Sequence, residues 1–161
     1  MIFIDLQNVL ISVETMGPPT RHINFENLAR TLTGSRRLMA AHAFDSIMPA
    51  PQEDPQRPFH DKLRYLGYRV HVRESSTEEG RKQKEVDVDM ACEMVVQAFM
   101  DNYDVAILVS GDRDFLPALL RVQGLGKRVE TAAFTDSMSE EMRRYSDRFH
   151  DLSGMDLLYQ V

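Results

Sequence analysis

Two aspartates with one residue between them, Asp112 and Asp114, follow a run of five apolar residues at positions 105–109. Such a run is typical of a strand buried on both faces in a parallel sheet, and an apolar pattern of helical period begins at Phe115. In an open α/β sheet, ligands bind at the carboxyl ends of the strands. The two carboxylates are therefore placed where a sheet of this kind receives its ligand.

The structural alternative for this pair is helix capping. Asp112 can accept a hydrogen bond from the first turn of the following helix, and Asp114 is favourable at the positive end of the helix dipole. Pro117 agrees with this interpretation because its missing N–H costs little in the first turn of a helix. The pair alone does not distinguish a helix cap from a cation site, so the choice between them depends on where the other acidic residues lie.

A third aspartate is expected to face inward from a helix. In the helix predicted over residues 85–100, Asp87 lies on the apolar stripe that must pack on the sheet, whereas Asp89 lies on the opposite, solvent-facing side. An inward carboxylate is costly unless it is hydrogen-bonded, paired or metal-bound. The structural alternative is a salt bridge to Lys84, one turn earlier in the chain.

The elements that must position these acids alternate between strands and helices. Alternation at this spacing indicates βαβ units, and therefore an α/β fold with a mostly parallel sheet and helices on both faces. We expect the strand order 3-2-1-4-5. The expected strands cover residues 1–6, 36–44, 68–72, 105–109 and 127–133, with a short last strand at 149–152. The expected helices cover residues 25–32, 59–66, 85–100, 115–124 and 137–145.

Three segments are expected to be loops. Residues 9–21 contain Gly-Pro-Pro, residues 45–58 contain four prolines, and residues 74–83 contain no apolar residue. Proline and glycine interrupt helices and ladders, and a segment without apolar residues has nothing to bury. The final residues, 156–161, give little information about their structure.

The expected strand order brings the acids together. The first and fourth strands are neighbours whose connections run to opposite sides, which opens a crevice at their carboxyl ends. Asp5 and Asn8 follow the first strand, and the helix that carries Asp87 runs antiparallel to the strands, so its start lies at the same edge. Four carboxylates in one pocket do not all stay ionised without a cation. Oxygen ligands without Cys or clustered His favour Mg²⁺ or Mn²⁺ over Zn²⁺.

Length and composition set the frame. The chain has 161 residues, which suits a single domain over 1–161, and a net charge of −6 with a pI near 5.3. Proteins that bind nucleic acid by general electrostatics are usually basic, so this chain needs a local basic patch to do so. No apolar stretch approaches a membrane span, no leader pattern opens the chain, and a single Cys92 excludes an internal disulfide. These features favour the cytoplasm.

Three motifs, followed by Gly126-Lys-x-Val129, carry a resemblance to a known family: Phe3-Ile-Asp5-x-x-Asn8, Lys84-x-Val-Asp87-Val and Leu108-Val-Ser-Gly-Asp112-x-Asp114-Phe115-x-Pro117. In this order, over about residues 1–135, they resemble the NYN domains of the LabA-like group, which are relatives of the PIN nucleases. The resemblance implies a three-layer, PIN-like Rossmannoid fold and a ribonuclease site that depends on Mg²⁺ or Mn²⁺. By position it assigns metal binding to Asp5, Asp87, Asp112 and Asp114, with Asn8 assisting.

Two positions depart from the pattern of the family. Glu85 stands where glycine is often found, and Leu6 replaces the glycine that frequently follows the first aspartate. Neither change removes an acid, so the expected metal site is intact. Leu6 and its neighbour Gln7 are expected to affect which substrate fits.

Candidate substrate contacts lie beside the acids. Arg113 stands between two of them, and Ser110 at the strand end can contact a phosphate, although capping of the following helix is its structural alternative. The basic residues Arg81, Lys82 and Lys84 can contact an RNA backbone, or they can simply keep a loop in solvent. The five histidines show no ligand spacing and receive no role.

Together these features predict a metal-dependent ribonuclease, and we expect an endonuclease acting on single-stranded RNA. The alternative is a PIN-like regulatory or protein-interaction module with weak or no cleavage, which the acidic net charge favours. A protein partner or a homodimer is compatible with either function. A phosphotransfer or phosphatase domain is disfavoured because no second aspartate follows Asp5 at the spacing such enzymes use.

Overall fold

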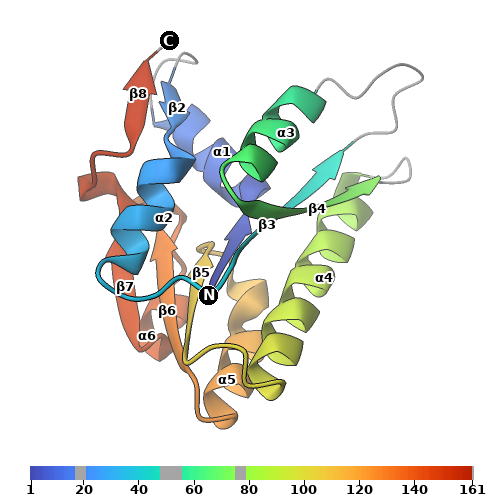
Figure 1. Cartoon of the computed structure of the whole chain (residues 1–161), viewed down its shortest axis with the longest axis vertical. Helices are drawn as coiled ribbons and strands as arrows, with labels where there is room; N and C mark the ends of the chain where they lie inside the picture. Colours follow the sequence, from blue (N-terminus) through green and yellow to red (C-terminus); the bar gives the residue numbers. More distant parts are fainter. Residues whose placement is uncertain (17–20, 48–55, 75–78, 161) are drawn as a thin grey trace.

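A six-stranded sheet forms the centre of the structure, which is a computed structural model describing residues 1–16, 21–47, 56–74 and 79–160 (Figure 1). Every neighbouring pair of strands in this sheet is parallel. The five strands of the predicted order 3-2-1-4-5 lie in that order, and the short last strand expected at 149–152 adds to one edge as a sixth. The order is β4 (Tyr68–Glu74), β3 (Ala41–Ile47), β1 (Ile2–Asp5), β5 (Val105–Val109), β6 (Arg128–Ala133) and β7 (Arg148–Asp151).

Helices cover both faces of this sheet, which confirms the predicted α/β class (Figure 1). Side chains of β1 alternate between the two faces, so Ile2 and Ile4 join one core cluster and Phe3 joins the other. One face is covered by α1 (Leu6–Thr15), α2 (Phe25–Thr33) and α3 (Arg57–Tyr65). The other is covered by α4 (Glu79–Phe99), α5 (Leu116–Gly124) and α6 (Glu140–Tyr145).

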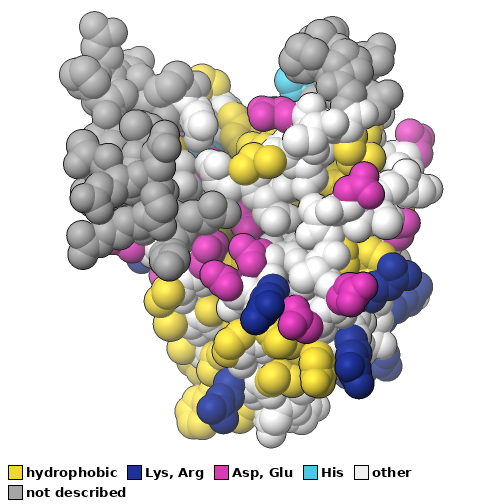
Figure 2. Space-filling model, turned by 180° about the vertical axis from the view of Figure 1, so that it is seen from behind, with side chains coloured by type: hydrophobic (Ala, Val, Ile, Leu, Met, Phe, Trp, Pro, Cys, Tyr) yellow, Lys and Arg dark blue, Asp and Glu magenta, His cyan; other side chains and the backbone are white. Residues whose placement is uncertain are grey.

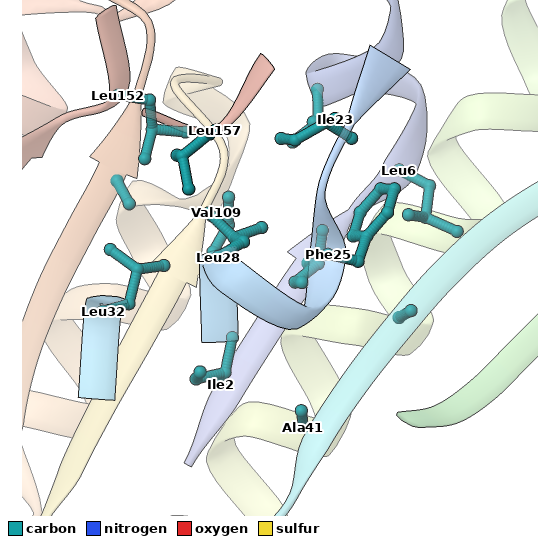
Figure 3. Packing of buried hydrophobic residues seen from close by; sticks show 14 of the residues in the cluster. Ile2, Leu6, Ile23, Phe25, Leu28, Leu32, Ala41, Val109, Leu152 and Leu157 are labelled. Carbon is teal, nitrogen blue, oxygen red and sulfur yellow. The ribbon is translucent and has the colours of Figure 1, made fainter. Parts of the chain in front are cut away.

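The first of these clusters shows what holds a helix layer on the sheet (Figure 3). Leu28 and Leu32 of α2 are fully buried against Ile2 of β1, and Val109 of β5 lies in the same cluster. Burial of each such side chain contributes about 1.5–3 kcal/mol. The apolar residues from which α2 was predicted, Leu28 and Leu32 among them, therefore form the face of the helix that packs on the sheet.

A helix replaces the loop that was expected from residue 9. Asp5 caps α1 by accepting a hydrogen bond from the backbone N–H of Asn8 at 3.0 Å, and Leu6, Val9 and Val13 form its buried stripe. The prediction of a loop was therefore wrong for residues 9–15. The Gly-Pro-Pro sequence on which it rested lies within 17–20, outside the described residues.

Other boundaries also differ from prediction. β3 begins at Ala41, because Leu38 and Met39 remain exposed and do not join the ladder. It then runs through Asp45 to Ile47. α4 begins at Glu79, so the loop predicted over 74–83 was wrong at both ends, with residues 75–78 outside the description. Glu, Arg, Lys and Gln have favourable helix propensity even without an apolar stripe, which accounts for the longer helix.

Two short strands were not predicted at all. β2 (Arg21–Ile23) pairs antiparallel with β8 (Leu158–Gln160), which joins an early segment to the C-terminal end of the chain. Strands of three residues carry too little alternation to be recognised from sequence. In the described part of the chain, no helix has the length and apolar character needed to cross a bilayer.

Candidate functional site

Asp5 lies at the carboxyl end of the central strand β1 and is buried. Its Oδ1 accepts the Asn8 backbone N–H, and its Oδ2 accepts the hydroxyl of Ser110 at 3.2 Å. Burial raises the pKa of Asp5 to about 6, although both hydrogen bonds favour the ionised form. The nearby carboxylates of Asp112 and Asp45 contribute to this rise in the pKa. This strand end therefore holds a carboxyl group whose charge is poorly compensated.

The loop after β5 is tied to the same strand end. The backbone N–H of Gly111 donates to Asn8 Oδ1 at 3.3 Å, and the backbone N–H of Asp112 donates to Ser110 Oγ at 3.2 Å. Ser110, fully buried, thus bridges Asp5 and the backbone of Asp112. The first and third predicted motifs meet through these bonds.

Only glycine fits at position 111. A Cβ atom there would lie 2.0 Å from the carbonyl oxygen of Ser137, a separation that real Cβ atoms do not show. The Gly111 carbonyl also accepts the backbone N–H of Ser139 at 3.0 Å. The close approach of these two loops fixes the backbone immediately before Asp112.

Asp112 does cap the turn that follows it. Its Oδ1 accepts the backbone N–H of Asp114 at 2.9 Å and begins a short 3₁₀ helix, Arg113–Phe115, ahead of α5. The capping alternative therefore describes one oxygen of Asp112 correctly. A cap of this kind also fixes the direction of the carboxylate, so capping and cation binding are compatible roles.

Asp87 lies near the start of the inward-facing part of α4 and is half-buried. Burial raises the pKa of Asp87 to about 7, and the charges of Asp5, Asp112 and Asp114 raise it as well. The structure therefore brings the four predicted aspartates into one electrostatic neighbourhood. Asp89 instead pairs with Arg73 at 3.0 Å, away from that group. Figure 2, which views the molecule from behind, shows several acidic side chains close together near the middle of the surface.

The donor chemistry of the four aspartates fits a hard divalent ion, since all the available ligand atoms are oxygens. The raised pKa values of Asp5 and Asp87 are what repulsion and burial produce when no cation offsets them. As the side chains stand, however, no three His, Cys, Asp or Glu residues of the described chain are close enough together to hold one ion.

Four basic residues were also predicted to contact the substrate. Arg113 is exposed and is 3.6 Å from a carboxylate oxygen of Glu141. Arg81, Lys82 and Lys84 belong to α4, but their side chains lie outside the described part of the structure. The alternative salt bridge between Lys84 and Asp87 is likewise outside it.

A buried polar group that sequence reasoning missed lies next to Asp5. Asp45, on the neighbouring strand β3, is fully buried and contacts His60 Nε2 at 2.8 Å. The amide of Gln7 donates to the other Asp45 oxygen at 2.8 Å and to the carbonyl of Ser46 at 3.3 Å. Asp45 follows an apolar strand segment just as Asp5 does, which is the sequence signal that was available. It was missed because the strand was predicted to end at residue 44, three residues too early, which put Asp45 in a loop.

Comparisons with known proteins agree with the fold and identify the family. The chain is 27% identical to the Low amplitude and bright protein LabA of Synechococcus elongatus, over 96% of this chain and 83% of that protein. It is also similar to the crystal structure of VPA0982, a protein of unknown function from Vibrio parahaemolyticus, with a TM-score of 0.81 and 25% identity over 98% of this chain and 94% of that one. The sequence pattern of the NYN domain matches residues 1–154, which confirms the resemblance. The chain therefore belongs to the NYN domain family, within the PIN-like nuclease superfamily.

Proposed function

We propose that this protein is a divalent-metal-dependent ribonuclease that hydrolyses phosphodiester bonds at a site formed by Asp5, Asp87, Asp112 and Asp114. Proteins of its superfamily are generally nucleases that depend on divalent metal ions. The observation that carries the proposal is the convergence of these four acids, which come from β1, α4 and the turn after β5. Mutual repulsion of this kind opposes folding, so a ligand that offsets it is the physical reason for its presence.

Each acid would contribute differently to holding Mg²⁺ or Mn²⁺. Asp5 is fixed by hydrogen bonds to both of its oxygens, and Asp112 is fixed by its cap, so these two define a rigid base. Asp87 would add a carboxylate from α4. A bound ion would lower the pKa of an attacking water and offset the charge that develops on the phosphate.

The neighbouring residues would position the substrate and the acids. Asn8 holds the Gly111 backbone through its amide oxygen, and its amide N–H groups would orient a phosphate oxygen or a water. Ser110 is buried between Asp5 and Asp112, which supports a positioning role over direct phosphate contact. Arg113 on the exposed rim, with Arg81, Lys82 and Lys84 of α4, would contact the backbone of single-stranded RNA.

The test is cleavage of a labelled single-stranded RNA in the presence of Mn²⁺. We expect wild-type protein to cut it and Asp112→Asn to lose cutting while keeping its fold, because one oxygen remains to cap the turn. Asp89→Asn is the matched control, since Asp89 pairs with Arg73 outside the acidic group. Wild-type protein that leaves RNA intact with Mn²⁺ would contradict the proposal.

The second candidate function is a regulatory or protein-interaction module that cleaves weakly or not at all. The net charge of −6 favours it, because a negative surface repels an RNA backbone. Under this function, Mn²⁺ would stabilise the protein without producing cleavage. The same assay therefore separates the two candidates.

A further inference from the structure

The carboxyl-terminal half of α4 exposes apolar side chains on the side facing away from the sheet. Met90, Met94 and Ala98 form the buried face of this helix, and at most 3% of each is exposed. About half a turn around the helix, 48% of Val96 and 78% of Phe99 are exposed. A helix that is apolar on opposite faces is usually covered on both of them. Nothing in the described part of the chain covers the second face.

The neighbouring helix α5 extends this exposed area and forms a groove with it. Leu120 of α5 is 44% exposed, Leu125, just beyond α5, is 41% exposed, and Met100, just beyond α4, is 62% exposed. Figure 2 shows hydrophobic side chains gathered at the end of the molecule where α4 and α5 lie. The groove has a volume of about 470 Å³ and is lined by Val95, Val96, Phe99, Leu120, Arg121, Gly124 and Leu125. These residues and Met100 are called the α4/α5 surface below.

The size of this surface is that of a protein interface. The exposed fractions of its side chains correspond to roughly 500 Å² of apolar area, at the upper end of what a monomer usually exposes. Two such surfaces facing each other would bury at most on the order of 1,000 Å², the lower limit for a specific interface and the range of weak, concentration-dependent dimers. The area on one copy of the chain therefore suffices for a weak dimer.

The α4/α5 surface is also complementary to itself. Phe99 projects from it, while the groove beside Phe99 is concave, so one surface carries both a projecting ring and an apolar recess. A two-fold interface requires this combination, because the same patch must supply both partners. We propose that the α4/α5 surface is a homodimer interface in which Phe99 of each copy enters the groove of the other.

The charges argue for a second copy over a membrane or RNA. Arg121 is the one charged residue among the described side chains that line the groove. Anionic lipid surfaces and RNA backbones both require several basic residues, and the chain as a whole carries a net charge of −6. A mostly apolar face with a single charge matches a second face of the same kind.

The proposed interface is remote from the acidic site. Phe99 lies twelve residues after Asp87 on the same helix, a separation of about 18 Å along the axis. A dimer formed through the α4/α5 surface would therefore leave both acidic sites open. The inference does not depend on the proposed ribonuclease activity, and each can fail without the other.

The test is the mass of the full chain in solution, measured by light scattering and sedimentation equilibrium over a concentration series. We expect wild-type protein to have twice the chain mass of 18.5 kDa. Phe99→Glu and, from the other helix, Leu120→Asp should each weaken the dimer by about 30-fold or more, as central interface residues do. Both positions are substantially exposed, so circular dichroism should show an intact fold.

Tyr65→Glu is the matched control, because Tyr65 is an aromatic residue of α3 that is 91% exposed outside the α4/α5 surface. It should leave the dimer unchanged. Wild-type protein that remains at 18.5 kDa at the highest concentration would overturn the proposal and assign the surface to a different partner. Dimerisation that survives both Phe99→Glu and Leu120→Asp would overturn it as well.

Discussion

The hydroxyl of Ser110 donates a hydrogen bond to Oδ2 of Asp5 across 105 positions of sequence, and both residues are buried. The same hydroxyl accepts the backbone N–H of Asp112. One side chain therefore links the ends of the two central strands, β1 and β5. The positions of two proposed metal ligands depend on a residue that is itself inaccessible to substrate.

Replacing Ser110 with alanine should disturb this link while preserving the packing. Asp5 would lose a hydrogen bond to a buried oxygen, which costs about 1–3 kcal/mol of stability. Loss of a residue that orients a metal ligand typically weakens metal affinity or activity by about 10–100-fold. Thermal unfolding and Mn²⁺ titration of Ser110→Ala measure the two effects. A change in stability with Mn²⁺ affinity unaltered would contradict the positioning role.

Removing the charge of Asp87 should stabilise the metal-free protein at neutral and alkaline pH. Its pKa is raised from 3.8 to about 7, so the folded state binds a proton that the unfolded state has released. The favourable contribution is complete below the unfolded pKa and is lost as pH rises through about 7. Above that pH the carboxylate opposes folding, and Asp87→Asn removes the opposition.

The expected gain for Asp87→Asn is about 1 kcal/mol after allowance for its partial exposure, or about 2–4 °C in Tm. Thermal unfolding without metal at about pH 8 and about pH 4 measures it, and the gain should vanish at the lower pH. Asp89→Asn loses its pair with Arg73 and should show no such gain. Destabilisation by Asp87→Asn at the higher pH would mean that Asp87 is not repelled by its neighbours.

Gly111→Ala should destabilise the protein because its Cβ has no space beside the Ser137 carbonyl. Forcing these two backbone segments apart is expected to cost about 1–3 kcal/mol. Gly124→Ala is the matched control: a Cβ there meets nothing within 4 Å, and the position is helical. The control should be neutral or stabilising by up to about 1 kcal/mol. Equal unfolding temperatures for both variants would contradict the close approach of the loops.

His60→Leu should be strongly destabilising because it leaves Oδ2 of the buried Asp45 carboxylate without its partner, although Gln7 still donates to Oδ1. Loss of one member of a buried pair costs about 3–5 kcal/mol. Adding Asp45→Asn should recover part of that loss, since the stranded charge is then removed. Chemical denaturation of the single and double variants measures the coupling. Strict additivity of the two substitutions would contradict a direct interaction between these side chains.

The sequence predicted the central architecture well because long apolar runs and their spacing determine it. Residues 105–109 form β5 as predicted, and Asp87 lies among the other acids, as helix phase predicted. Asp89 was predicted to face solvent, but it is partly buried and pairs with Arg73 of β4. Local patterns failed where tertiary contacts decide the structure. α1 begins at the cap supplied by Asp5, and β2 forms only because β8 is there to pair with it.

The candidate site likewise has a part that could be predicted from the sequence and a part that could not. Its aspartates could be recognised because strand ends are known positions for ligands. The bridge made by Ser110 and the pair formed by Asp45 and His60 could not, since each joins segments whose proximity sequence does not reveal. The steric requirement for Gly111 likewise comes from a distant carbonyl, that of Ser137.

The most direct test of a shared divalent-cation site is an Mn²⁺ titration of the metal-free protein. Calorimetry measures the binding, and thermal unfolding measures the stabilisation. Saturating ion should stabilise wild-type protein by about 2.7 kcal/mol at a hundred times its Kd. Each of four single substitutions by Asn should reduce this stabilisation: those of Asp5, Asp87, Asp112 and Asp114. Asp89→Asn should leave it intact. Absence of Mn²⁺ binding by wild-type protein, or binding by all four variants as tight as that of wild-type protein, would contradict the account.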